Sequence, residues 1–239
     1  MVESLRNLLT RPNILRPPVR RSIANAYYAR GHRNWKNMKS HDLDQVHDLM
    51  AQNLEEDPAN VRDLRVWFQA YRRLINFDIL EAIDRLSSWA MREDSAEAHY
   101  YLYILHFLRW RQGILQDHRS VIEHIGKCRA LAGKIARVRS FEWLAKTPPS
   151  CPLVHQTELG RWDDSTNFYE NTDPLALVGG TVKLIKGPQS GQLALGPFEV
   201  FFVPGNSFFP AKDENKETQF YLGFSYDGFR AWRVKRATD

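Results

Sequence analysis

The amino-acid sequence predicts an α+β chain of two parts, helical repeats followed by a small five-stranded β-barrel. Apolar residues recur with helical spacing as far as Lys146, whereas from Leu153 onward they alternate along short segments. The stretch KTPPSCP, residues 146–152, separates the two patterns, because its prolines fix φ and remove backbone donors. We therefore expect a helical domain at residues 1–146 and a barrel domain at residues 151–239.

The composition is that of a folded protein whose charge is divided between the two parts. Hydrophobic residues make up 43% and charged residues 26% of the 239 positions, which argues against a disordered chain. Residues 1–150 carry 24 Lys and Arg against 17 Asp and Glu, while residues 151–239 carry 9 against 11. The basic excess of the first part indicates either a phosphate-binding surface or ordinary solvated helix faces.

Features that would place the chain in a membrane or an oxidising compartment are missing from the sequence. The longest apolar run, at residues 100–108, is far shorter than the roughly 20 residues of a membrane span. The first residues lack the apolar core of a signal peptide. Cys128 and Cys151 form neither a CxxC pair nor a disulfide framework. These features predict a cytoplasmic protein with no membrane partner.

The helical part shows a repeat of helix pairs. One apolar stripe consists of Leu64, Trp67, Phe68, Tyr71 and Ile75. A wider stripe in EAHYYLYILHFLRW, residues 97–110, predicts the most buried helix.

Two expected helix starts, Asp57 and Asp94, are 37 residues apart, which is typical of a degenerate tetratricopeptide-like solenoid. We expect helix pairs at 18–54, 58–92 and 95–132, followed by a short basic helix at 137–145.

The barrel part contains five β-rich segments that end at glycine, proline or Asn/Asp clusters. These segments are GTVKLIKG (180–187), SGQLALG (190–196), EVFFVPG (199–205), TQFYLGFSYDG (218–228) and FRAWRV (229–234). LVHQTELGRWDD, residues 153–164, precedes them and predicts one strand and a turn.

The motif order GTVKLIKG, EVFFVP and FYLGFSYDGFRAW resembles a cold-shock-type OB-like barrel. Together with the helical repeats, it resembles the C-terminal region of bacterial antiviral multidomain NTPases and of the animal sterile-alpha-motif antiviral factors. The resemblance covers nearly all of residues 20–235. It implies a nucleic-acid-binding module in antiviral defence.

Most stacking positions of a cold-shock barrel are not aromatic in this chain. They are occupied by Leu184, Gln192, Ala194 and Val203. Phe201 is the stacking ring that the resemblance retains, and Lys183 and Lys186 remain as phosphate partners.

The aromatic residues of FYLGFSYDGFRAW divide between the two faces of a strand. Phe220, Leu222 and Phe224 share one face, which we expect to fill the barrel. Tyr221 and Trp232 carry polar groups and suit a surface, together with Arg230.

Catalytic motifs are not recognisable in the sequence. GPQSGQ lacks the lysine of a phosphate loop, and no HExxH motif occurs. His99 and His106 lack a carboxylate that would complete a ligand set. His155 and Glu158 are the best acid–base pair, although such a pair in a strand and turn is usually structural. We therefore expect a protein that is not an enzyme and has no cofactor.

The sequence thus predicts a non-catalytic module that binds nucleic acid, with RNA favoured over DNA. The expected binding residues are Lys183, Lys186, Phe201, Tyr221, Arg230 and Trp232 of the barrel, with Lys134, Arg137 and Arg139 of the basic helix. The alternative is a protein-interaction module, in which the helical repeats bind a partner protein and the barrel is a structural cap.

Overall fold

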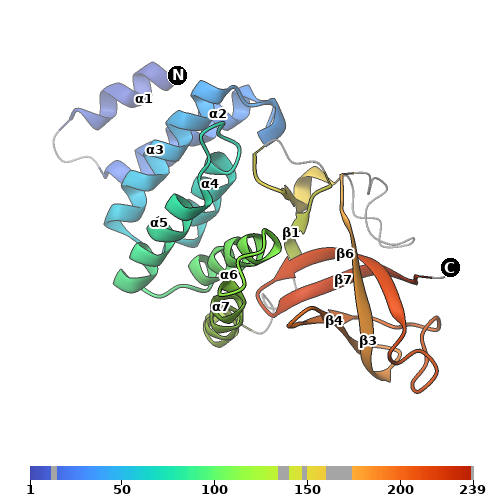
Figure 1. Ribbon diagram of the computed structural model, residues 1–239. Coiled ribbons are helices and arrows are strands. Elements are labelled where there is room, and N and C mark those ends of the chain that lie inside the picture. The colour runs from blue at the N-terminus through green and yellow to red at the C-terminus, as the bar shows by residue number, and fades with distance from the viewer. Residues whose placement is uncertain (12–14, 134–139, 147–149, 160–173, 238–239) are drawn as a thin grey trace. The chain divides into compact units, whose positions relative to one another are not determined.

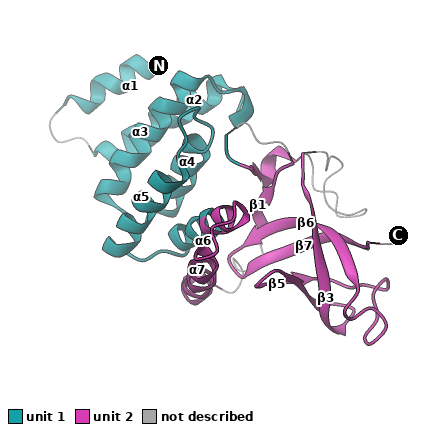
Figure 2. Cartoon of the chain, viewed as in Figure 1, with its two compact units in different colours: residues 1–105, 149–151 teal, residues 106–148, 152–239 magenta. Residues whose placement is uncertain are grey.

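The computed structural model describes residues 1–11, 15–133, 140–146, 150–159 and 174–237 (Figure 1). Its contacts form two compact units, residues 1–105 with 149–151 and residues 106–148 with 152–239 (Figure 2). The chain crosses from one unit to the other inside helix α6 (Ala96–Arg111), and it crosses twice more within the proline-rich stretch at residues 146–152.

Unit 1 is helical, as the periodicity predicts. It contains α1 (Val2–Leu9), α2 (Arg16–Arg30), η1 (Trp35–Asn37), α3 (Ser40–Glu56), α4 (Val61–Tyr71), α5 (Ile79–Arg92) and the first part of α6. With α7 (Asp117–Leu131) of unit 2, the helices α2 to α7 occupy the positions expected for three pairs. None of the described helices has both the length and the apolar character needed to cross a bilayer.

Helix α4 shows both a confirmed and a wrong expectation. Trp67 and Phe68 are fully buried, in agreement with the apolar stripe. Ile75 is 94% exposed, because α4 ends before it. The helix also begins later than expected: the side chain of Asn60 caps it by accepting a hydrogen bond from the Asp63 N–H, whereas Asp57 follows the end of α3.

Several arginines of unit 1 are consumed by internal ion pairs. Arg21 makes a two-pronged contact with the buried Asp63, with Nε–Oδ1 and Nη2–Oδ2 distances of 2.8 and 2.7 Å. Arg65 pairs with the buried Glu97 at 2.9 Å, and the buried Arg20 pairs with Glu56. These cations therefore organise the helices and are not free for a ligand.

Unit 2 contains a closed five-stranded barrel. Its strands are β3 (Leu177–Gly187), β4 (Ser190–Leu195), β5 (Phe198–Phe202), β6 (Glu217–Ser225) and β7 (Gly228–Arg236). Hydrogen bonding runs in the order β3-β4-β5-β7-β6 and back to β3. The β5–β7 pair is parallel and the others are antiparallel. All five strands lie where the sequence predicts them.

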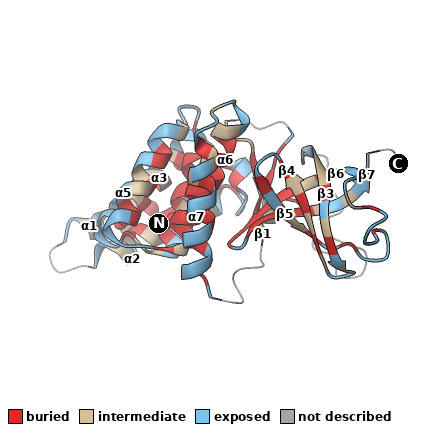
Figure 3. Cartoon of the chain, turned by 60° about the horizontal axis from the view of Figure 1, so that its bottom comes forward, coloured by how far each residue is buried: buried red, intermediate tan, exposed pale blue. Residues whose placement is uncertain are grey.

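Buried residues alternate with more exposed ones along most of the barrel strands, while the end of β6 is buried throughout (Figure 3). On β6, Phe220, Leu222 and Phe224 are each 0% exposed, which confirms their expected face. On β7, Phe229 and Ala231 are buried in the same way. Most of the rings in FYLGFSYDGFRAW are therefore core residues.

Rings from the end of α6 pack against the aromatic core of the barrel. The Phe107 ring centroid lies 4.9 Å from that of Phe229 and 5.6 Å from that of Phe224. Trp110 packs edge-on against Phe198 at 4.8 Å. These contacts explain why the second half of α6 belongs to the barrel unit.

Two further strands, β1 (Ser140–Leu144) and β2 (Leu153–His155), extend the sheet beside β6. Residues 140–144 thus form a strand, and the expected helix at 137–145 is wrong there. The Trp143 ring explains Gly223 in the middle of β6: a Cβ at Gly223 would lie 2.9 Å from that ring. The strand forms because β1 pairs with the distant strand β6. Helix propensity depends on the local sequence and gives no information about such a partner.

Candidate nucleic-acid interface

A row of half-buried side chains crosses the outer face of the barrel. The register pairs Leu184 of β3 with Gln192 of β4, Gln192 with Phe201 of β5, and Phe201 with Arg230 of β7. The pleat places Phe201 outside because its neighbours Val200 and Phe202 point into the core. The row brings together an apolar residue, an amide, a ring and a guanidinium.

The guanidinium of Arg230 lies over the ring of Phe201, with Cζ 4.7 Å from the ring centroid. Burial lowers the pKa of Arg230, and the Asp227 carboxylate opposes this shift. Asp227 itself pairs with Arg129 at 3.1 Å. Within the described part of the chain, no carboxylate forms an ion pair with the Arg230 guanidinium and no group accepts a hydrogen bond from it. The Arg230 guanidinium therefore has N–H donors available for a ligand.

Lys183 is held at the same face by Glu199. Its Nζ lies 2.8 Å from Glu199 Oε1, and both side chains are more than half exposed. An exposed pair of this kind is worth about 0–1 kcal/mol, so a phosphate can replace the carboxylate at little cost. Lys186 is also exposed and lies near the end of β3, next to the turn that leads to β4. Glu199 was not anticipated from sequence, although its position two residues before Phe201 on β5 places it on this face.

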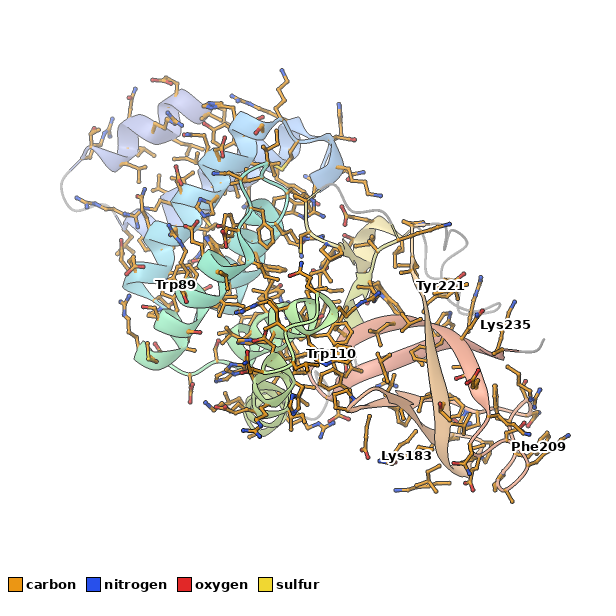
Figure 4. All side chains as sticks on the ribbon, viewed as in Figure 1. Trp89, Trp110, Lys183, Phe209, Tyr221 and Lys235 are labelled. Carbon is orange, nitrogen blue, oxygen red and sulfur yellow. The ribbon has the colours of Figure 1, made fainter. Side chains whose placement is uncertain are left out.

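Tyr221 and Trp232 lie elsewhere on the barrel wall. They face each other on β6 and β7 and pack against a second apolar cluster: Trp143, Ala145, Val154, Leu159 and Leu175. Figure 4 shows Tyr221 well separated from Lys183. Both rings are half-buried in this cluster, and the structure does not bring them together with Phe201.

The barrel carries a net positive charge, which favours an anionic ligand, although residues 151–239 taken together are net negative. Residues 174–237 carry eight Lys and Arg against five Asp and Glu. The acidic excess of the second part comes from residues outside this range. Lys134, Arg137 and Arg139, which the sequence adds to the binding surface, lie outside the described residues.

The acid–base candidates are engaged in structural contacts. The backbone N–H of His155 donates to Glu158 Oε2 at 2.8 Å, and the His155 side chain caps the short 3₁₀ helix η2 (Gln156–Glu158). His99 contacts Asp94 and His106 contacts Asp117, each at 3.1 Å. Among the described residues, no three His, Cys, Asp or Glu side chains gather as metal ligands would.

The outer face of β3, β4, β5 and β7 is therefore the best-formed candidate site in the barrel. It retains four of the six barrel residues expected from sequence, Lys183, Lys186, Phe201 and Arg230, and adds Gln192 and Glu199. Comparison of the chain with protein-family models, with curated proteins and with solved structures gives no match.

Proposed function

We propose that the chain is a non-catalytic nucleic-acid-binding module, and that its barrel binds a single strand on the outer face of β3, β4, β5 and β7. A base would stack beside Phe201, and the Gln192 amide would contact its edge. Arg230 and Lys183 would contact phosphates. RNA is the proposed ligand, in preference to DNA.

The observation that carries this proposal is the arrangement of Arg230. A half-buried guanidinium loses hydration, and hydrogen bonds to a charged group contribute about 1.5–3 kcal/mol when they are made. No described group of the chain makes them. A phosphate or a base edge supplies acceptors, and the contact of the Arg230 guanidinium with the Phe201 ring suits stacking with a base.

The strand arrangement supports the same proposal. A closed five-stranded barrel is compatible with an OB-like fold, in which the face of the second and third strands binds oligonucleotides. Those strands correspond here to β4 and β5. The choice of RNA, and a role in antiviral defence, rest on the motif resemblance of FFVPG and FYLGFSYDGFRAW.

The test is fluorescence anisotropy of the full chain with a 12-nucleotide single-stranded RNA and the matching DNA. Phe201→Ala should weaken binding by about 1–3 kcal/mol, which is the usual contribution of one stacked base. Arg230→Gln should weaken binding by a similar amount. Phe209→Ala and Arg119→Gln are the matched controls, because they remove a 48% exposed ring and an exposed cation elsewhere in unit 2.

Equal losses from the controls and the site variants would show that the face is not the binding surface. No binding of either strand at low salt would refute the proposal. A folded circular dichroism spectrum for each variant is the necessary companion measurement.

The alternative function, protein interaction by the helical repeats, is favoured by the internal ion pairs of unit 1. Arg20, Arg21 and Arg65 are bound to Glu56, Asp63 and Glu97 and add little to a phosphate surface. Crosslinking in cells, followed by identification of bound RNA and bound protein, separates the two functions.

A further inference from the structure

The beginning of the chain has an unusual run without acidic residues. From Ser4 to His41 there are nine Lys and Arg and no Asp or Glu. Some of these cations are neutralised by acids from later helices, as Arg20 and Arg21 show. Most of the cations at the connection between α2 and α3 have no such acidic partner among the described residues.

The connection between α2 and α3 carries a cation at every third position: Arg30, Arg33, Lys36 and Lys39. All four side chains are exposed. Arg30 lies 3.6 Å from the buried carboxylate of Asp42. In the described structure the other three make no ion pair. His32 and His41, both exposed, lie in the same segment.

An open cavity of about 550 Å³ lies at this connection, lined by Arg30, Gly31, Asn37, Lys39, His41 and Asp42. This volume falls within the range of small-molecule sites. Its lining contains no Phe, Tyr or Trp and no large apolar side chain, so the His41 imidazole is the single ring of the lining on which a base can stack. The first turn of α3 adds backbone N–H groups, because Lys39 provides no side-chain cap.

The connection between α2 and α3 has a defined conformation. Trp35 is buried and its ring lies 4.7 Å from that of Tyr28. His32 and Arg33 both adopt positive φ, at 54° and 56°, which is strained for residues other than glycine. A Cβ on Gly31 would lie 2.7 Å from Met38 Cγ. The fold therefore holds one of the exposed cations, Arg33, in a costly backbone conformation.

We propose that the cavity between α2 and α3 is a phosphate-binding site in unit 1, in addition to the barrel face and independent of it. Lys39 and Arg30 line the site, the amide of Asn37 donates to phosphate oxygens, and Arg33 and Lys36 add positive potential. The phosphates belong either to a nucleic-acid backbone or to a small phosphorylated molecule. The polar lining favours phosphate groups over bases in both cases.

The test is isothermal titration of the full chain with sodium pyrophosphate at low ionic strength. Lys39→Glu should weaken binding at least tenfold. Arg62→Glu is the matched control, since it reverses an exposed cation in the first turn of α4 in the same unit, and it should change affinity less than twofold. Phe201→Ala in the barrel should leave pyrophosphate binding unchanged, even if the barrel proposal fails.

A second arm identifies the source of the phosphates. If they belong to a strand, Lys39→Glu should reduce the slope of log affinity for single-stranded RNA against log salt by about 0.7 per lost contact. If the slope is unchanged while pyrophosphate binding is lost, the ligand is a small phosphorylated molecule. Equal losses from Lys39→Glu and Arg62→Glu, or no pyrophosphate binding by the wild-type chain, would overturn the site.

Discussion

Replacing Phe107 with alanine tests whether the end of α6 is part of the barrel core. Phe107 lies on α6, which the sequence places in the helical domain, yet its side chain is 0% exposed. Its ring contacts Phe198, Phe224 and Phe229, at centroid distances of 5.7, 5.6 and 4.9 Å. The variant removes this ring and leaves the barrel strands themselves unchanged.

The expected cost is large. Truncation of a buried phenylalanine to alanine costs about 3–5 kcal/mol, because the cavity that remains closes only in part. Each aromatic pair contributes about 0.5–1.5 kcal/mol beyond burial, and Phe107 makes three such pairs within the barrel. We therefore expect a loss near the upper end, about 4–5 kcal/mol. Since domains are stable by about 5–15 kcal/mol, the barrel would lose a large share of its stability.

Amide hydrogen exchange read by mass spectrometry is the suitable assay, because it reports the stability of β5 and β7 separately from the helices of unit 1. Phe209→Ala is the control, since the Phe209 ring is 48% exposed. Exchange should accelerate in the barrel peptides of Phe107→Ala and stay near wild type in the control. Unchanged protection of β5 and β7 in Phe107→Ala would refute the packing argument and favour a barrel domain that is independent of α6.

Three further variants test the barrel at other points. Phe224→Ala should cost about 3–5 kcal/mol, whereas Tyr221→Ala should cost less because its ring is half-buried; urea denaturation that gives equal losses would contradict this face assignment. The hydrogen bonds from Arg236 and from the Phe209 N–H lower the pKa of Asp213 to about 2. Unfolded Asp titrates near 3.9, about two units higher, so this stabilisation should be complete above that pH and be lost as the pH falls toward 2. Asp213→Asn should flatten this acid limb in thermal melts, and an unchanged limb would assign the effect to other carboxylates.

The elements with strong local signals could be predicted from the sequence. The five barrel strands are alternating segments between turn residues, so pattern alone locates them. The stripe of α6 also predicts its deep burial correctly. The stripe does not indicate which element packs against it. The position of Phe107 in the sequence pattern would be the same whether α6 packed against another helix or against a barrel.

The elements that depend on distant partners could not be predicted. SFEWL, residues 140–144, contains good helix formers and becomes a strand only because the edge of β6 is available. The boundary within α6 has the same cause: it follows from contacts between residues about 90 to 120 positions apart, such as Phe107 with Phe198 and Phe229. Composition and proline content carry no information about such contacts.

The residues of the candidate site could likewise be predicted only in part from the sequence. The resemblance and the strand pattern identify Phe201 and Arg230 separately, but their stacking depends on the parallel register of β5 and β7. Tyr221 and Trp232 satisfy the same sequence criterion, an aromatic residue on the outer face of a strand. The added strand β1 gives them a cluster to pack against, centred on Trp143. An outward-facing ring is therefore available to a ligand only where no further layer of the chain covers it, and in this barrel that distinction separates Phe201 from Tyr221.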